Sequence, residues 1–257
     1  MRTRSLLTVS AALMLASCGG ESSQSAAKTT AVPVALTCAT GGTCVVGDSG
    51  PGGGIVFYVA ATSFACGATL ASSCIYLEAA PSGWFVSPAS GCEAAESLDV
   101  DPTCVWWSIE PMDAGDGQYT TGTTGKAIGT GYKNTTEIVT QYGTGVAPAA
   151  ASQDYRGGGL SDWFLPSKDE LNEMCIYFSG VPKVGGVCNG NGAADVARAG
   201  VGGFANDYYW SSTEKEWNEA TGDPIYIFMQ RFADGLQAYG GDNSYVRPVR
   251  ASTFSSI

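Results

Sequence analysis

The chain has 257 residues and a net charge of −11, from 13 basic and 24 acidic residues, and it contains no histidine. Nucleic-acid binding needs a basic footprint, so the acidic balance argues strongly against it. Without histidine, the Ser-His-Asp and Cys-His catalytic arrangements and histidine metal ligands are excluded. The length suits one domain of ordinary size preceded by shorter segments.

Residues 1–17 have the pattern of a lipoprotein signal peptide. Arg2 and Arg4 precede a short apolar run that ends in the sequence LASC, with Cys18 as its last residue. A basic start, a short apolar core and small residues are typical of a secretory signal, and a cysteine at the cleavage point is typical of a bacterial lipoprotein. We therefore expect Cys18 to carry diacylglycerol and a further acyl chain such as palmitate. An ordinary cleaved signal with a chance cysteine is the alternative.

Residues 18–43 are predicted to form a flexible, lipid-anchored tether, because they are rich in Ser, Ala, Thr and Gly. No aspartate follows Cys18, so in a cell with two membranes we expect export to the outer membrane. The partners expected are then the membrane, through the lipid, and a surface glycan or an envelope protein. The remainder, residues 44–257, is predicted to be a single domain, and its oligomeric state stays open.

Eight further cysteines predict disulfides, since an even number in an exported chain is typical of a disulfide framework. A zinc site is the alternative, but the chain has neither a C-x-x-C pair nor a histidine. The spacing predicts four local pairs. These are Cys38–Cys44, Cys66–Cys74, Cys92–Cys104 and Cys175–Cys188.

The first half of the domain reads as two strands followed by a long region of turns. The β-branched and aromatic run 55–59 predicts a strand after the glycine-rich turn 48–54, and a second strand is predicted at 74–79. Residues 82–131 are mostly turns. A helix is predicted to begin at Asn134, where an N-cap residue is followed by an acid three positions later.

A stronger capping box begins at Ser167, with Asp169 and Glu170 in the first turn of the predicted helix. Near the N-terminus of a helix its dipole favours acids, so we interpret both as structural. Apolar residues then recur on one helical face. They are Leu171, Met174, Cys175 and Phe178.

The C-terminal part is predicted to be β again, with strands at 208–210, 225–229, 236–239 and 245–249. Asp234 and Gly235 predict the hairpin turn between the second and third of these strands. Pro248 predicts that the last strand lies at an edge or ends there. The expected class is α+β, with a twisted, mostly antiparallel sheet, about two helices and long loops pinned by disulfides.

Four ordered blocks then indicate a family. They are GDSGPGGGIVFY at 47–58, GLSDWFLPSKDEL at 159–171, YWSSTE at 209–214 and YVRPVR at 245–250. They resemble the C-terminal domain of bacterial collagen-like adhesins over roughly 47–251. The resemblance implies a C-type-lectin-like fold, in which the N- and C-terminal strands pair and a long loop region binds ligand, and it implies an adhesin that binds carbohydrate.

The chain departs from this family and from related folds at several points. It has no Gly-X-Y period, so no collagen-like stalk is implied. The sequences EPM at 110–112 and WNE at 217–219 only partly match the sugar-binding motifs of C-type lectins. The block 165–171 also resembles formylglycine-generating enzymes, but those need a cysteine pair near the C-terminus, and no cysteine follows Cys188.

Tryptophans in predicted loops are the candidate ligand-binding residues, because an indole face stacks on the C–H surface of a sugar while nearby polar groups bind its hydroxyls. The alternative is that they form the core of a loop-rich domain, which is our expectation for Trp163 and Trp210. The candidates are Trp84, Trp106, Trp107 and Trp217.

Asp113 and Asp116 could coordinate calcium through their oxygens, but the sequence DAGDG lacks the full twelve-residue calcium-loop pattern, and a plain polar turn is the favoured interpretation. No other cofactor is expected. The function that these patterns favour is a non-enzymatic, lipid-anchored surface module that binds a glycan or another surface ligand. An envelope protein with a structural or protein-interaction role is the first alternative, and a glycoside hydrolase that uses two carboxylates is the second.

Overall fold

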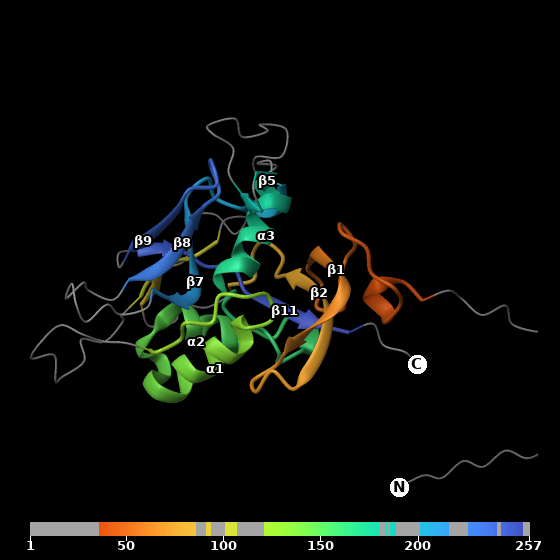
Figure 1. Cartoon of the computed structure of the whole chain (residues 1–257), viewed down its shortest axis with the longest axis horizontal. Helices are drawn as coiled ribbons and strands as arrows, with labels where there is room; N and C mark the ends of the chain where they lie inside the picture. Colours follow the sequence, from red (N-terminus) through yellow and green to blue (C-terminus); the bar gives the residue numbers. More distant parts are fainter. Residues whose placement is uncertain are drawn as a thin grey trace, which may run out of the picture. The chain divides into compact units, whose positions relative to one another are not determined.

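The computed structural model describes residues 36–85, 91–93, 101–106, 121–179, 183–184, 186–188, 201–215, 226–240 and 243–253. All of them belong to one compact unit, Ala35–Ile257. Figure 1 shows this unit as an α+β arrangement, in which α1 and α2 lie at one end of β7 and α3 lies between two sheets. Among these residues no helix is both long and apolar enough to cross a membrane.

The smaller sheet has three antiparallel strands in the order β1-β2-β11. They are β1 (Ile55–Cys66), β2 (Ser72–Ala79) and β11 (Val249–Ser252). The predicted first strand is confirmed, but it runs on to Cys66 because Phe64, Ala65 and Cys66 pair with the start of β2. The Cys66–Cys74 disulfide closes this hairpin.

The larger sheet has six strands in the order β3-β4-β10-β7-β8-β9, and its one parallel pair is β10 with β7. The first three strands in this order are β3 (Cys92–Glu93), β4 (Thr103–Val105) and β10 (Asn243–Tyr245). The other three are β7 (Tyr208–Glu214), β8 (Ile227–Arg231) and β9 (Gln237–Gly240). A separate hairpin joins β5 (Lys183–Val184) to β6 (Val187–Cys188).

The predicted strand 245–249 is divided between the two sheets. Tyr245 ends β10 and Val249 begins β11, with Pro248 between them. Proline has no N–H to donate to a ladder. The chain therefore leaves one sheet and enters the other here, and the Pro248 carbonyl instead accepts the Ala80 N–H at 2.9 Å.

The described ranges contain three α-helices: α1 (Gly131–Tyr142), α2 (Ala147–Asp154) and α3 (Lys168–Ser179). The prediction that α1 begins at Asn134 is wrong. Asn134 is buried inside the helix, where its side-chain amide donates to the Gly125 carbonyl at 2.7 Å. The residue before the helix, Thr130, has helical backbone angles and makes no side-chain capping bond.

The helix α3 confirms its capping box. The Ser167 N–H donates to the Glu170 carboxylate at 2.7 Å, and the Glu170 N–H donates to the Ser167 hydroxyl at 3.4 Å. The predicted apolar face is buried. Four short 3-10 helices complete the described elements: η1 (Cys38–Thr40), η2 (Gly143–Gly145), η3 (Gly157–Gly159) and η4 (Val201–Gly203).

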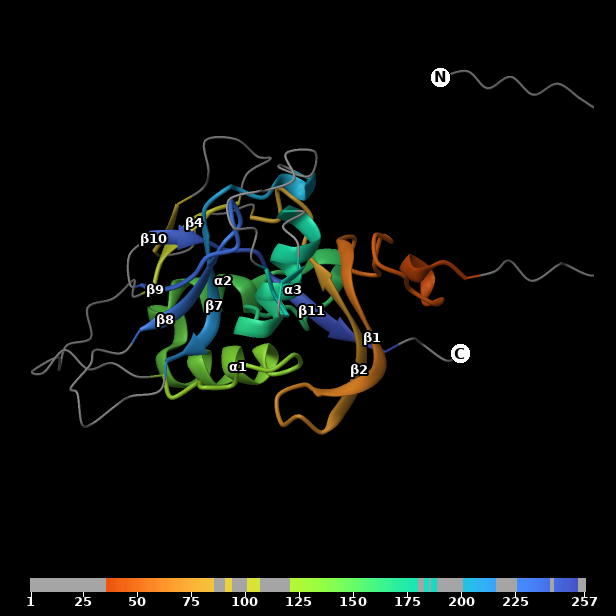
Figure 2. The ribbon, with the colours of Figure 1, turned by 45° about the horizontal axis from the view of Figure 1, so that its top comes forward.

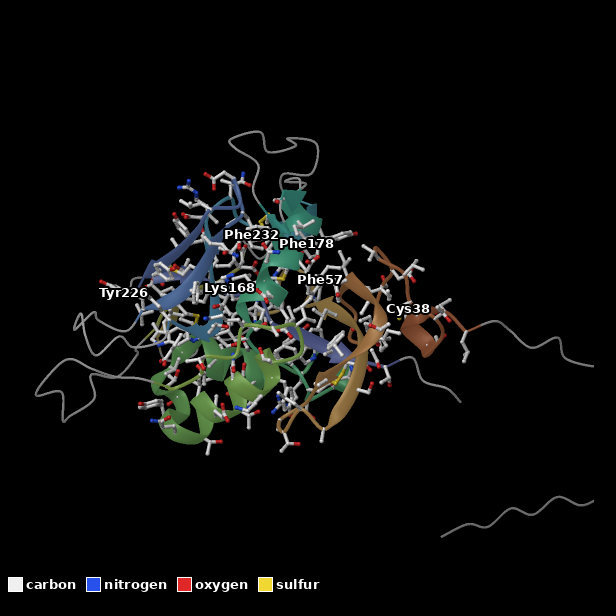
Figure 3. All side chains as sticks on the ribbon, in the orientation of Figure 1. Cys38, Phe57, Lys168, Phe178, Tyr226 and Phe232 are labelled. Carbon is white, nitrogen blue, oxygen red and sulfur yellow. A yellow bond between two sulfur atoms is a disulfide. The ribbon has the colours of Figure 1, made fainter. Side chains whose placement is uncertain are left out.

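The core divides into two large clusters and a small one. The first contains Trp163 and Trp210, both fully buried as predicted, and packs beneath α1 and α2. The second joins β1, α3 and β7, and includes the buried rings of Phe57, Phe178 and Phe232 (Figure 3). All four disulfides have the pairing that the cysteine spacing predicted.

The small cluster lies where the sequence predicted tether. Residues 36–43 are folded in the structure, and Cys38 packs with Cys44 against Val56 and Tyr76. The folded part of the chain therefore begins before residue 44.

Candidate ligand-binding surface

The structure buries two of the four tryptophans proposed to bind ligand. Trp84 and Trp106 keep only 4% and 1% of their surface exposed, and both belong to the first core cluster. Tyr155 packs edge-on against Trp84, and Trp106 packs against Trp210 with ring centroids 5.2 Å apart. Neither indole offers a face to a sugar here, which corrects the prediction for these two residues.

The other predicted site residues lie outside the described part of the chain. They are Cys18, Trp107, Trp217, Asp113 and Asp116. Within the described part, no group of three or more histidine, cysteine, aspartate or glutamate side chains could hold a metal ion.

The Trp84 indole belongs to a buried polar cluster around Asp101. Its N–H donates to the Asp101 carboxylate at 2.9 Å, and the Tyr209 hydroxyl donates to the same carboxylate at 2.8 Å. Arg247 forms an ion pair with Asp101 at 2.5 Å and donates to the Ala80 carbonyl at 2.8 Å. Burial raises the pKa of Asp101, and the Arg247 charge opposes that rise. Burial and the neighbouring carboxylate raise the pKa of Tyr209 well above 10.

A second buried charge cluster explains the glycine-rich block. Glu78 accepts the N–H groups of Gly52 and Gly54 at 3.2 and 2.8 Å, and it pairs with Arg250 at 3.1 Å. Arg250 also pairs with Asp162 at 2.8 Å. Burial lowers the pKa of Arg250, but the hydrogen bonds and charges of Asp162 and Glu78 outweigh burial and raise it.

Side chains could not fit in this glycine loop. A Cβ atom on Gly50 would lie 2.2 Å from the Glu78 carboxyl carbon, and one on Gly52 would lie 2.3 Å from the Trp163 ring. The glycines let the backbone approach the carboxylate closely enough to donate to it. The glycine-rich block at 47–58, one of the four that carry the family resemblance, therefore positions the Glu78 carboxylate.

Two further buried acids are held by backbone N–H groups. Glu170 accepts from Gly129 at 2.8 Å and from Ser167, and Glu214 accepts from Thr121 and Gly122 at 2.5 and 2.8 Å. Burial raises the pKa of Glu170 to about 7, although its hydrogen bonds oppose the rise. The hydrogen bonds of both acids connect loops to the sheet or to α3, and those of Glu170 agree with its structural interpretation.

Three aromatic side chains gather at the outer strands of the larger sheet: Phe228 is buried, Tyr226 is partly buried and Tyr239 is exposed. Tyr226 directly precedes β8 and lies two residues before Phe228, so the two share one face of the extended chain, and Tyr239 on β9 is the direct partner of Phe228. The ring centroids of Tyr239 lie 6.3 Å from Tyr226 and 4.8 Å from Phe228. Tyr239 is 50% exposed, because β9 is the edge strand of the sheet.

Two lysines lie over these rings. Lys215 Nζ is 5.8 Å from the Tyr226 centroid and 5.3 Å from the Tyr239 centroid, and Lys168 Nζ is 5.5 Å from the Phe228 centroid. We call these five residues the tyrosine–lysine face. Figure 3 labels Tyr226 at the outer end of this face and Lys168 on its inner side.

Backbone pairing fixes the geometry of this face. The Lys215 N–H donates to the Tyr226 carbonyl at 2.8 Å, which extends the pairing of β7 with β8 past the end of the strands. At the other end, the β8–β9 turn contains Gly235 at φ 77° and an ion pair between Arg231 and Asp234. The Arg231 side chain holds the pKa of Asp234 below its ordinary value.

A polar groove lies on the other side of the β7 terminus. It has a volume of about 460 Å³, and its polar lining comes from α1 and the segment before it. The Glu214 carboxylate holds Thr121 and Gly122, and the next residue, Lys215, belongs to the tyrosine–lysine face, so the two features meet at the end of β7. The lining residues are Thr121, Gly122, Lys133, Thr136, Glu137, Thr140 and Gln141.

Sequence reasoning missed Tyr226 and Tyr239 because they read as ordinary strand residues. The usable signal was an aromatic pair at i and i+2 in one strand, with a third aromatic in the strand that follows a predicted two-residue turn. None of the family models, curated proteins or solved structures compared with the chain matches it.

Proposed function

We propose that this domain is a non-enzymatic binding module of a bacterial cell surface and that its ligand is a glycan. The observation that carries the proposal is the tyrosine–lysine face. It places the rings of Tyr226 and Tyr239 side by side on the buried Phe228, with two ammonium groups over the rings, at an edge where Tyr239 is half exposed.

The chemistry of this face suits a sugar. A tyrosine ring presents an apolar surface and a polar tip, so it can pack on the C–H face of a sugar while its hydroxyl remains available for a hydrogen bond. A lysine ammonium carries three donors, so it can bind a sugar hydroxyl or a carboxylate in addition to its contacts within the protein. The groove beyond Glu214 adds threonine hydroxyls and the Gln141 amide, which are also matched to hydroxyl groups.

An enzymatic reading has less support. Glycoside hydrolysis needs two carboxylates that face the substrate. The buried acids Glu78, Asp101, Glu170 and Glu214 each accept several protein hydrogen bonds, and two of them are paired with arginine. These carboxylates organise loops, so we do not assign them to catalysis.

The lipoprotein and lectin-like parts of the proposal rest on further observations. Four disulfides are typical of an oxidising compartment outside the cytoplasm, which agrees with a signal ending at Cys18. The first hairpin and the last strand share one sheet, as the C-type-lectin-like fold and the adhesin resemblance imply.

A glycan array probed with the mature protein tests the proposal. Wild-type protein is expected to bind a defined subset of glycans, and the double variant Tyr226→Ala, Tyr239→Ala is expected to lose that binding while unfolding at a similar temperature. Leu236→Ala is the matched control, because Leu236 is exposed in the same hairpin but lies outside the face. Absence of binding to every glycan, or binding that the double variant retains, would contradict the proposal and favour a protein partner.

A further inference from the structure

Exposed aliphatic side chains are concentrated at the start of the folded chain. Leu36, Val45 and Val46 are 49%, 59% and 47% exposed. They make up half of the exposed large hydrophobic residues in the described ranges, although they lie within eleven consecutive positions. Isolated exposed apolar residues are ordinary, but a local group of them marks an interaction surface. We call residues 36–46 the N-terminal loop.

The N-terminal loop is a built structure. The Cys38–Cys44 disulfide closes it, and both cysteines are buried. Across the loop, the Gly42 N–H donates to the Thr37 carbonyl at 2.7 Å. The Val45 N–H donates to the Asp48 carboxylate at 2.9 Å. The aliphatic side chains are therefore held outward by a closed loop attached to the sheet.

The sequence around this loop has no charge. No charged residue occurs between Lys28 and Asp48, whereas charged residues make up 14% of the whole chain. A protein with a net charge of −11 would be repelled by an anionic surface. Apart from the Asp48 carboxylate, which accepts the Val45 N–H, the loop presents uncharged, apolar groups, and such a surface approaches a lipid bilayer at low electrostatic cost.

The loop also lies at the end of the domain that is remote from the tyrosine–lysine face. Figure 3 labels Cys38 and Tyr226 at opposite ends of the described unit, and Figure 2 shows the same separation between the N-terminal loop and strands β8 and β9. In the sequence, Leu36 follows the predicted lipid attachment site, Cys18, by 18 residues.

We propose that the N-terminal loop rests on the lipid bilayer and that Leu36, Val45 and Val46 enter its interface. The contact orients the tyrosine–lysine face away from the membrane. It rests on the proposed lipid attachment at Cys18, since three aliphatic side chains are too few to bind a membrane alone. An anchor raises their local concentration at the bilayer, and a second weak signal then becomes effective.

Tryptophan substitution in the full lipidated chain tests this contact. Leu36→Trp reports on the N-terminal loop, and Leu236→Trp is the matched control at the far end, because the two leucines are 49% and 48% exposed. Each variant, and wild type, is reconstituted into vesicles of phosphatidylethanolamine and phosphatidylglycerol, with or without brominated acyl chains. Mass spectrometry of the N-terminal peptide establishes the lipid on Cys18 in the same sample.

The expected result is loss of the added Leu36→Trp emission on brominated vesicles, with a shift to shorter wavelength, and no loss for Leu236→Trp. Equal quenching of the two variants would overturn the contact, as would a blue shift of Leu36→Trp without bromine quenching, which indicates protein contact. If Cys18 carries no lipid, the anchoring proposal fails and the bilayer contact fails with it. Lipid on Cys18 without quenching would overturn the bilayer contact alone.

Discussion

Two cation–aromatic clusters in this domain contain similar groups in opposite settings. Arg250 lies 5.9 Å from the Trp163 ring, beside Glu78, and all three side chains are buried. Lys215 lies at similar distances from the rings of Tyr226 and Tyr239, at the open edge of the larger sheet. In the first cluster Glu78 and Asp162 accept from Arg250, and Tyr155 packs against the Trp163 ring, whereas in the second Tyr239 is half exposed.

The difference teaches which aromatic residues can be functional. The largest side chains in their segments are buried in the core, because they remove the most apolar area from water. They are Trp84, Trp106 and Trp163. The smaller and more polar tyrosines on β8 and β9 remain at the surface. If the contrast is correct, disruption of the first cluster costs stability, and disruption of the second costs binding.

The same substitution in the two clusters is expected to give the largest contrast. Arg250→Met leaves the Glu78 carboxylate buried without its cation, which should lower the free energy of unfolding by about 3–5 kcal/mol. Lys215→Met is expected to change it by less than about 1 kcal/mol, because surface charge interactions contribute little. Urea unfolding with disulfides intact measures both. Similar losses in the two variants would break the comparison.

The buried carboxyl group of Glu170 should make the free energy of unfolding depend on pH. Burial raises the pKa of Glu170 from 4.5 to about 7, so between these values the folded state holds a proton that the unfolded state has released. The contribution of Glu170 to the free energy of unfolding is therefore complete below about pH 4.5. It falls as the pH rises and is lost once the pH has passed 7, by roughly 3 kcal/mol in total.

Glu170→Gln is expected to flatten the pH dependence of unfolding in this range. Asp169→Asn is the control, one residue away and exposed, and it should leave the dependence as in wild type. Thermal unfolding followed from pH 5 to pH 8 gives the comparison. A Glu170→Gln profile parallel to that of wild type would argue against a raised pKa.

Two buried tryptophans, Trp210 and Trp106, test how much a buried hydrogen bond adds to the free energy of unfolding. The Trp210 N–H donates to the Cys104 carbonyl at 2.8 Å, whereas the buried Trp106 N–H has no hydrogen-bond partner among the residues that the structure describes. Trp210→Phe removes a hydrogen bond to a buried carbonyl and is expected to cost about 1 kcal/mol beyond the loss of packing. Trp106→Phe loses similar packing and removes an unpaired donor, so its cost should be smaller in urea unfolding. The reverse order would contradict this assignment.

Local signals predicted much of the fold. The capping box at Ser167 and the spacing of Cys175 and Cys188 were sufficient, because both depend on neighbours within a few turns of chain. Helix α2 was not predicted, since its alanine-rich sequence is buried on nearly all sides and shows no amphipathic period. The start of α1 was misplaced because Asn134 is a good N-cap residue whose amide serves a tertiary contact with Gly125.

The buried Glu78–Arg250 pair and the tyrosine–lysine face both depend on long-range contacts, which no local sequence pattern contains. Glu78 and Arg250 are 172 positions apart, and their pairing follows only from the arrangement of β2 and β11. The exposure of Tyr239 follows from the edge position of β9, and alternation along a strand does not distinguish an edge from a centre. The loop positions of the tryptophans predicted accessible side chains, whereas Trp84 and Trp106, the two that the structure describes, are buried in the core.

Calorimetric titration of a glycan identified on the array tests the binding claim most directly. We predict that Tyr239→Ala raises Kd at least about tenfold, which corresponds to about 1.4 kcal/mol, and leaves the unfolding temperature close to that of wild type. Leu236→Ala should bind as wild type does. Unchanged affinity in Tyr239→Ala, with the fold intact, would contradict the assignment of the tyrosine–lysine face as the binding site.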